Sequence, residues 1–248
     1  MTAPVFVVDR VPAGPEFVLD GPEGRHAVSV KRLRAGEDVV LTDGLGRFAE
    51  GVVKAAEGKD RLVVMDLHTV EEEPPPAPRI TVVQALPKGD RGELAVETMT
   101  ETGVDAIVPW AASRCITQWR GERAAKALAK WRATAREAGK QSRRVRFPEV
   151  SEAMTTKQVA ELLAGADLAA VLHEDREYGS EALATAELPA SGEIVLVVGP
   201  EGGVSPEELE AFTRAGARAY RLGRSVLRTS TAGTAAVALL LGRTGRWS

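Results

Sequence analysis

A proline-rich segment divides this sequence into two parts with different patterns. Residues 71–78 run Glu-Glu-Glu-Pro-Pro-Pro-Ala-Pro, so four of the last five positions are proline. Each proline fixes φ and lacks a backbone N–H, so neither a helix nor an inner strand continues through the segment. We therefore predict a semi-rigid linker at residues 74–78, which joins a first domain at 1–73 to a second domain at 79–248.

The first domain is predicted to consist mainly of short β-strands. Runs of β-branched residues alternate with Asp43-Gly44 and Glu57-Gly58, dipeptides that favour turns. One short helix fits residues 24–33. Several short strands within about 70 residues are typical of a small β-barrel. The strands are expected at residues 5–8, 39–42, 48–53 and 61–64.

The second domain contains longer apolar runs that alternate with helical segments. Continuous apolar runs are typical of strands in a parallel sheet that is covered on both faces. The helix at 124–138 is expected to turn Leu128 and Trp131 inward and its basic residues outward. This alternation predicts an α/β fold. Strands are expected at residues 80–85, 105–108, 168–172, 194–198 and 219–222, and helices at 94–102, 124–138, from 206 onward and at 232–241.

Charge is distributed unevenly along the chain. The 248 residues carry a formal net charge of −3, but residues 114–146 hold eleven basic side chains and only two acidic ones. Such asymmetry is a signal of a polyanionic partner, and a solvated outer face of a helix explains it equally well. The tryptophans Trp110, Trp119 and Trp131 are interpreted as core residues rather than as platforms that stack on bases.

Composition excludes several classes of protein. No apolar run approaches the roughly 18–20 residues that span a bilayer, and the amino terminus lacks the pattern of a signal peptide. The single cysteine, Cys115, forms no internal disulfide, which suits a reducing compartment. The isolated histidines His26, His68 and His173 lack the spacing of a zinc site. We therefore expect a cytoplasmic globular protein with no membrane partner and no metal.

A glycine-rich loop follows the apolar run at 194–198. Ser205 is a good N-cap for the next helix, Pro206 suits its first position, and Glu208 completes a capping box. The glycines at 199, 202 and 203 let the backbone approach a ligand closely, although a tight structural turn remains an alternative. The loop matches neither the Walker A nor the dinucleotide-binding pattern, so we predict a ligand held by backbone groups without a phosphate requirement.

A second loop leads into the last apolar helix. Thr229, Ser230 or Thr231 is expected to cap that helix. Arg228 precedes these hydroxyls and has the chemistry to bind a carbonyl or a phosphate of a substrate. A surface salt bridge is the alternative role for Arg228.

Together the two loops resemble the signature loops of a known family. Residues 196–212 and 221–232 are similar to those of the RsmE family, SPOUT-class enzymes that methylate N3 of a uridine in 16S ribosomal RNA with S-adenosylmethionine (SAM). Weaker similarities occur at residues 26–37, 88–91, 101–104 and 137–142. The resemblance implies a SPOUT-type α/β domain with a trefoil knot and an N-terminal PUA-like β-barrel that binds RNA. It also implies a homodimer with the cofactor site near the subunit interface, and 16S rRNA of the small ribosomal subunit as the partner.

The resemblance implies the cofactor-binding loops, whereas the catalytic and RNA-binding roles are hypotheses from the charge and position of the residues. Arg228 and Glu201 are the expected catalytic residues, and the family's usual glutamate is replaced here by Ser230, so no role for that glutamate is carried over. The expected cofactor-binding residues are Leu172, His173, Glu174, Gly199, Pro200, Glu201, Gly202, Gly203, Leu222, Gly223, Val226, Leu227, Thr229 and Ala232. The expected RNA-binding residues are Arg10, His26, Lys31, Arg32 and Arg34 in the first domain, and Arg143 and Arg144 in the second.

The chemistry leaves alternatives open. Uracil N3 carries a weakly acidic proton, so the reaction needs a proton acceptor or a cation that stabilises the anion. Glu201 is the expected base, and a role as a hydrogen-bond acceptor that braces the loop is equally compatible with its position. His26 is compatible with RNA binding and with a capping or turn role. A non-catalytic RNA-binding assembly factor and a SPOUT methyltransferase that acts on another RNA are the alternative functions.

Overall fold

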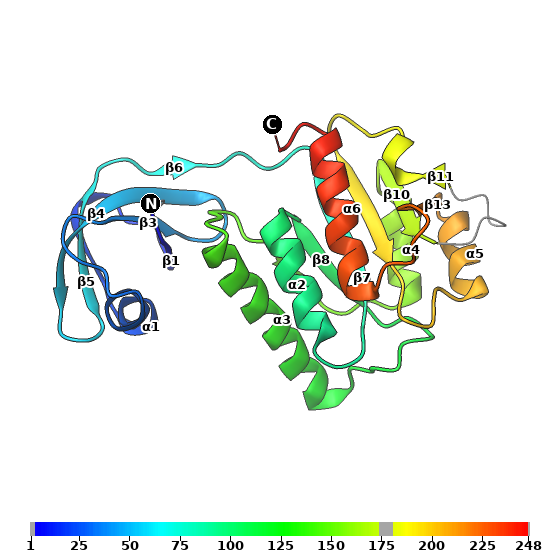
Figure 1. The fold of residues 1–248 in the computed structure, drawn as a ribbon, viewed down its shortest axis with the longest axis horizontal. Helices are drawn as coiled ribbons and strands as arrows, with labels where there is room; N and C mark the ends of the chain where they lie inside the picture. Colours follow the sequence, from blue (N-terminus) through cyan, green and yellow to red (C-terminus); the bar gives the residue numbers. More distant parts are fainter. Residues whose placement is uncertain (1–2, 174–180, 248) are drawn as a thin grey trace. The chain divides into compact units, whose positions relative to one another are not determined.

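The computed structural model describes residues 3–173 and 181–247 and divides into two compact units (Figure 1). The first unit comprises Met1–Pro75 together with Arg136–Phe147, and the second comprises Pro76–Ala135 and Pro148–Ser248. The division near the proline segment agrees with the sequence pattern. Residues 136–147, predicted as part of the second domain, instead pack within the first unit.

The first unit is built on a six-stranded mixed sheet. The strand order is β1-β3-β4-β5-β2, with β6 paired to β4 beside this path. Strand β1 runs parallel to β3, and the remaining pairs are antiparallel. Closure of this sheet into a barrel stays a prediction. The strands are β1 (Val5–Val7), β2 (Gly14–Leu19), β3 (Asp38–Thr42), β4 (Arg47–Glu57), β5 (Arg61–Leu67) and β6 (Glu71–Glu72).

The predicted helix at 24–33 is two short elements in the structure. The α-helix α1 (Gly21–Arg25) starts earlier, with Pro22 in its first turn. A π-helical turn, His26–Val30, follows directly, and the Lys31 N–H donates to the His26 carbonyl at 2.9 Å. Gly24 allows this close packing, because a Cβ there would overlap the carbonyl oxygen of Asp60.

Residues 142–147 join the first unit at the turn between β3 and β4. The Phe147 N–H donates to the Gly44 carbonyl at 2.8 Å, and the Gly46 N–H donates to the Val145 carbonyl at 3.1 Å. The Phe147 ring lies so close to Gly139 that a Cβ there would approach it to 2.5 Å. Glycine at 44 and 139 therefore makes room for one phenylalanine, which explains why this segment belongs to the first unit.

The second unit is built on a seven-stranded sheet in which every pairing is parallel. The strand order is β11-β13-β10-β12-β7-β8-β9. The predicted parallel α/β sheet is confirmed, and the trefoil knot stays a prediction. The strands are β7 (Arg79–Ala85), β8 (Ala106–Trp110), β9 (Glu149–Val150), β10 (Leu168–Leu172), β11 (Glu181–Ala182), β12 (Glu193–Val198) and β13 (Arg218–Arg221).

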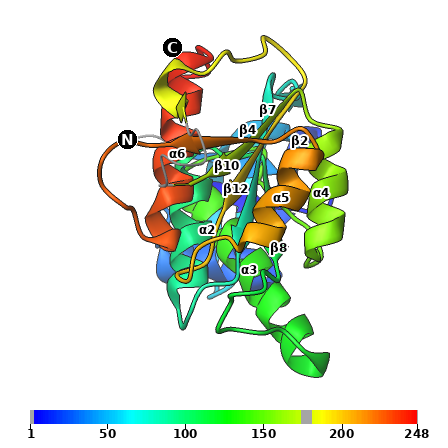
Figure 2. The ribbon, with the colours of Figure 1, turned by 90° about the vertical axis from the view of Figure 1, so that its right-hand side faces the viewer.

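Helices cover both faces of this sheet. Figure 2 shows α2 and α6 on one face and α4 and α5 on the other. Among residues 3–173 and 181–247, no helix combines the length and apolar character that a bilayer crossing requires. A short 3-10 turn covers Leu183–Thr185. The helices are α2 (Arg91–Thr102), α3 (Gly121–Gln141), α4 (Thr156–Ala164), α5 (Pro206–Arg214) and α6 (Thr229–Arg243).

Several predicted packing details are confirmed. Leu128 and Trp131 of α3 are buried, and Trp110 is fully buried in β8. Trp119 packs edge-to-face on Trp131, with ring centroids 5.1 Å apart. Gly103 ends α2 in the left-handed conformation, with φ of 116°. These tryptophans therefore contribute to the core of the second unit.

The capping box of α5 is a buried hydrogen-bonding centre. The Glu208 carboxylate accepts from the Ser205 N–H at 3.1 Å, as the sequence predicts. It also accepts from the Ser113 N–H at 2.7 Å and from the Thr156 hydroxyl at 3.0 Å. One carboxylate thus connects the start of α5 with the loop after β8 and the start of α4.

Replacement of Glu208 by alanine should strongly destabilise the second unit. Because three donors lose a buried charged acceptor, we expect the free energy of unfolding to fall by about 3 kcal/mol in urea denaturation. The control is Glu210→Ala on the same helix, which removes only an exposed ion pair with Arg214 and should cost less than about 0.5 kcal/mol. Equal losses for the two variants would contradict the assignment.

Candidate active site

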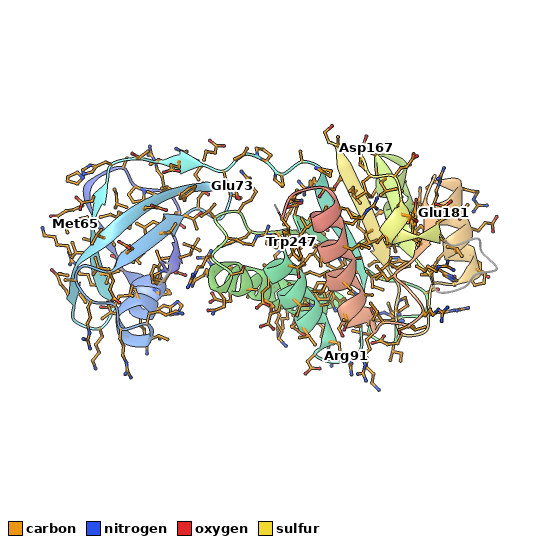
Figure 3. The ribbon with its side chains drawn as sticks, turned by 45° about the horizontal axis from the view of Figure 1, so that its top comes forward. Met65, Glu73, Arg91, Asp167, Glu181 and Trp247 are labelled. Carbon is orange, nitrogen blue, oxygen red and sulfur yellow. The ribbon has the colours of Figure 1, made fainter. Side chains whose placement is uncertain are left out.

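The two edges of the parallel sheet differ in character. At the amino edge, the Arg246 guanidinium forms two hydrogen bonds to the Asp105 carboxylate, at 2.6 and 3.0 Å. The Asp167 carboxylate accepts from the Glu193 N–H at 2.8 Å. Figure 3 shows Asp167 at the opposite edge of the sheet from Arg91, which begins α2 after β7. Side-chain hydrogen bonds therefore stabilise the amino edge of the sheet, and the carboxyl edge is the place to look for a binding site.

A cavity of about 480 Å³ lies at the carboxyl edge. Strand β12 lies between β7 and β10. From β7 the chain continues to β8 on one side of β12, whereas from β12 it continues to β13 on the other side. Such a reversal of strand order opens a crevice at the carboxyl ends of the strands. The cavity is lined by residues that follow β10, β12 and β13 and by the start of α6, together with Arg91.

The predicted cofactor-binding residues gather around this cavity with two exceptions. Glu174 lies outside the described residues. Gly202 is absent from the lining and instead lies against Arg114, whose guanidinium donates to the Gly202 carbonyl at 3.1 Å. The predicted cofactor-binding residues that line the cavity are Leu172, His173, Gly199, Pro200, Glu201, Gly203, Leu222, Gly223, Val226, Leu227, Thr229 and Ala232.

The glycine-rich loop is a tight turn whose backbone needs glycine. Gly203 has a φ of +72°, which side chains other than glycine rarely adopt, and its N–H donates to the Pro200 carbonyl at 2.9 Å. A Cβ on Gly199 would approach a methyl of Val204 to 2.9 Å. The loop is therefore folded closely on itself before α5 begins. This geometry is compatible with both interpretations of the loop, as a ligand-binding loop and as a structural turn.

The start of α6 differs from the sequence prediction. The N-cap is Arg228, and no side chain caps the helix. The Thr229 hydroxyl instead donates to the Gly199 carbonyl at 2.8 Å and accepts from the Gln84 amide nitrogen at 2.9 Å. The predicted capping by Thr229, Ser230 or Thr231 is wrong because a tertiary partner takes the Thr229 hydroxyl.

Glu201 contacts the backbone of a neighbouring loop. Its Oε1 accepts from the Lys88 N–H at 3.1 Å, and the residue is exposed at the rim of the cavity. This bond connects the glycine-rich loop with the loop between β7 and α2. The contact is the one expected of a residue that braces the loop.

The cavity rim is rich in arginine. The lining contains Arg228 and three arginines that sequence reasoning missed, Arg91, Arg221 and Arg224. None of the four forms an ion pair with the part of the chain that the structure describes. Glu201 is the only carboxylate among the described lining residues. The rim is thus electropositive and suited to an anionic substrate or a developing negative charge. The fourfold cluster was not apparent in the sequence because Arg91 is more than 100 residues from the rest.

All seven predicted RNA-binding residues fall in the first unit. Arg143 and Arg144, predicted in the second domain, belong to the segment 136–147 that packs with the first unit. The Arg144 guanidinium donates to the Arg146 carbonyl at 2.9 Å. The exposed members are Arg10, Lys31, Arg32, Arg34 and Arg143. This unit therefore carries a set of exposed cations.

His26 is held in a cluster within the first unit. Its Nδ1 lies 3.3 Å from the Lys140 Nζ, and its ring packs edge-to-face on Phe6. The Lys140 ammonium is nearly buried and forms an ion pair with the Glu23 carboxylate at 2.8 Å. Burial first, and the Lys140 charge second, lower the pKa of His26 from its ordinary value of 6.5. These contacts place His26 in the packing of the unit, and a direct RNA contact by it stays a prediction.

Comparisons with known proteins identify the family. A model of an RNA methyltransferase domain matches residues 73–241, and a model of an RNA methyltransferase PUA domain matches residues 19–65. Ribosomal RNA small subunit methyltransferase E from Mycobacterium tuberculosis is 46% identical over 253 aligned positions, which cover 100% of this chain and 94% of that protein. The chain belongs to the RsmE family. The relative of the same name from Bacillus subtilis is 27% identical over 90% of this chain and 88% of its own length.

Solved structures share this RsmE fold. Ribosomal RNA small subunit methyltransferase E from Neisseria gonorrhoeae, bound to S-adenosyl methionine, has a TM-score of 0.82 at 30% identity, covering 98% of each chain. A methyltransferase from Legionella pneumophila with the bound cofactor SAM has a TM-score of 0.83 at 26% identity, covering 98% of each chain. A SPOUT-type α/β domain and a PUA-like domain are therefore the two parts of this RsmE chain.

The lowered pKa of His26 predicts how stability depends on pH. The unfolded chain binds a proton at His26 more readily than the folded chain, so the free energy of unfolding should fall as pH drops below about 6.5. A His26→Gln variant should lose less stability than the wild type between about pH 7.5 and pH 5.5 in urea denaturation. The exposed His68, changed to Gln, is the control outside the cluster. The same loss in His26→Gln as in the wild type would contradict the prediction.

Proposed function

We propose that this chain transfers the methyl group of SAM to N3 of one uridine in the 16S rRNA of the small ribosomal subunit, in the cytoplasm. The observation that carries the proposal is the convergence of both family signature loops on one cavity whose rim is electropositive. Membership of the RsmE family and the SAM-bound relatives support the same reaction.

The cavity suits a ligand such as SAM. Its volume of 480 Å³ lies within the range of about 300–1,000 Å³ typical of small-molecule sites. Leu172, Val198 and Leu222 supply apolar wall for an adenine ring, and the closely folded glycine loop supplies backbone polar groups. When bound, SAM provides an electrophilic methyl group on a sulfonium. The residues of this chain fit that group without a phosphate-binding motif.

The rim arginines supply the charge that the acceptor base needs. Loss of the N3 proton to solvent water leaves a negative charge that spreads onto the uracil carbonyl oxygens. Arg228, at the mouth of the cavity, stabilises that anion, and the neighbouring arginines Arg91 and Arg224 strengthen the positive potential. Glu201 braces the loop through the Lys88 N–H and is not the base in this proposal. Cation stabilisation is thus favoured over proton removal by a carboxylate.

RNA binding is assigned to the exposed cations of the first unit. Arg10, Lys31, Arg32, Arg34 and Arg143 contact phosphates, which give affinity but carry no sequence information. Target choice then depends on the shape of the RNA and on an extruded uridine that enters the cavity.

A homodimer forms through α6 in this proposal. One side of the helix is half-buried or exposed and carries no charge, and the rest of the helix is core apart from the exposed Arg243 at its end. Small residues on such a face allow a second helix to approach closely, and α6 begins at the cavity. The interface would therefore border the cofactor site. The residues on this side are Thr231, Thr234, Ala235, Ala238, Leu239 and Gly242.

The departure at Ser230 leaves the cavity intact. Ser230 is buried in the first turn of α6 and is not part of the cavity lining. The cavity is therefore formed without a contribution from residue 230, which favours a methyltransferase over a non-catalytic assembly factor. An activity on another RNA has no observation of its own in its favour.

The function is tested by methyl transfer to two substrates that lack the modification, small ribosomal subunits and naked 16S rRNA. We expect one N3-methylated uridine when the products are mapped. Absence of methylated product on both substrates, with no SAM bound in calorimetry, would leave the assembly-factor alternative. Methylation of a different RNA alone would support the other alternative.

Replacement of Arg228 should reduce the chemical step. Because one cation is lost from the charge-stabilising rim, we expect Arg228→Ala to lower the single-turnover rate about 100-fold at saturating SAM. Arg228→Lys should restore part of the rate. Glu201→Gln is the matched comparison and should keep the pH profile of the wild type. A larger loss in Glu201→Gln than in Arg228→Ala, with a changed pH profile, would identify Glu201 as the base.

Reversal of charge in the first unit should weaken RNA binding. A triple change of Lys31, Arg32 and Arg34 to Glu should lower affinity and reduce the slope of log affinity against log salt by about two. Lys157→Glu on α4, which also replaces an exposed cation, is the control. Unchanged affinity and slope in the triple variant would remove these residues from the binding surface.

A further inference from the structure

A fully buried glutamine lies behind the cavity. Gln84, near the end of β7, has no exposed surface, and the cavity lining does not include it. Its amide nitrogen donates to the Ala85 carbonyl at 3.0 Å and to the Thr229 hydroxyl oxygen at 2.9 Å. The Thr229 hydroxyl then donates to the Gly199 carbonyl at 2.8 Å. We call this chain of hydrogen bonds, from Gln84 through Thr229 to Gly199, the buried relay.

The direction of the buried relay is fixed by its two ends. The Ala85 carbonyl only accepts, so it orients the Gln84 amide with its nitrogen toward Thr229. That nitrogen only donates, so the Thr229 oxygen must accept from it. The single hydroxyl proton of Thr229 is then available for the Gly199 carbonyl. Without the amide, the hydroxyl would be able to rotate.

The buried relay connects both signature loops to the centre of the sheet. Gly199 begins the glycine-rich loop, and the next residue, Pro200, has no N–H. The peptide group between them therefore has only its carbonyl to anchor it. Thr229 is the first residue of α6 and follows Arg228 directly. Gly199, Pro200, Arg228 and Thr229 all line the cavity, so the position of the relay sets the position of both walls.

The Gln84 amide carries an energetic penalty at its core position. Its Oε1 is buried and has no hydrogen-bond partner among the described residues. A buried carbonyl without a donor destabilises a fold, whereas an apolar side chain of similar size carries no such penalty. Stability alone therefore does not account for the amide, and its nitrogen provides what an apolar residue lacks.

We propose that Gln84 is a positioning residue, which sets the affinity for SAM by fixing the Thr229 hydroxyl on the Gly199 carbonyl. The proposal rests on the proposed function for the identity of the ligand. It assigns a role to a residue that is fully buried and lies outside the cavity lining. Gln84 acts through Thr229, and Thr229 acts on the glycine-rich loop.

Three variants separate this role from a merely structural one. Gln84→Met keeps the size of the side chain and removes the donor and the unpartnered oxygen together. Thr229→Val keeps the shape and removes the hydroxyl, and Thr229→Ser keeps the hydroxyl. Thr100→Val is the control for loss of a buried hydroxyl elsewhere in the unit, because Thr100 is fully buried in α2 and bonds the Val96 carbonyl.

Calorimetric titration with SAM measures the effect on binding. We expect the dissociation constant to rise about fivefold to tenfold in Gln84→Met and Thr229→Val, the effect of one lost neutral hydrogen bond. Thr229→Ser should recover most of the affinity that Thr229→Val loses, and Thr100→Val should bind as the wild type does. The double variant Gln84→Met with Thr229→Val should bind no worse than Thr229→Val alone, because both changes break the same relay. The melting temperature of Gln84→Met should equal or exceed that of the wild type.

Amide hydrogen exchange in the absence of SAM gives an independent readout. Residues 201–204 should exchange faster in Gln84→Met and Thr229→Val, more slowly in Thr229→Ser than in Thr229→Val, and at the wild-type rate in Thr100→Val. If the wild type binds SAM and all variants bind it equally, the role of Gln84 is overturned while the proposed function stands. If the wild type binds no SAM, the proposed function fails, and unchanged exchange at residues 201–204 would then overturn the relay as well.

Discussion

The site depends on the insertion of one strand into a parallel sheet. Strand β12 is inserted between β10 and β7, two strands that precede it in the sequence, and pairs with both. All three strands run in the same direction, so their carboxyl ends meet at one edge. The loop after β12 is therefore flanked by the ends of β10 and β7, and the chain returns to the same place at the start of α6. Convergence of loops from distant parts of the sequence follows from this single constraint.

Basic residues occur in both units, and we propose a different role for them in each. In the proposed function, the exposed cations of the first unit provide general affinity for a polyanion, whereas the arginines at the cavity rim provide local positive potential. The helix α3 contributes to both units, because residues 136–141 pack in the first and the rest in the second. The net charge of −3 thus conceals two separate basic regions.

Local signals in the sequence predicted the local structure well. The apolar runs marked the strands, and the spacing of Ser205 and Glu208 predicted the capping box that the structure contains. Thr155 and Gln158 carry the equivalent signal before α4 and form a capping box there as well. Tertiary partners explain the failures. The Thr229 hydroxyl bonds Gln84, 145 residues away, instead of capping its own helix. The Phe147 ring packs against Gly44 and Gly139, which explains why residues 136–147 belong to the first unit. No local pattern contains these pairings.

In the proposed function, the cavity at the carboxyl edge of the second unit holds the methyl donor. The most direct test is amide hydrogen exchange of the wild-type protein with and without saturating SAM. We expect slower exchange in three segments, residues 168–173, 196–204 and 220–232, with no change in the first unit. Protection confined to other segments, or no protection at a SAM concentration shown to saturate methyl transfer, would contradict it.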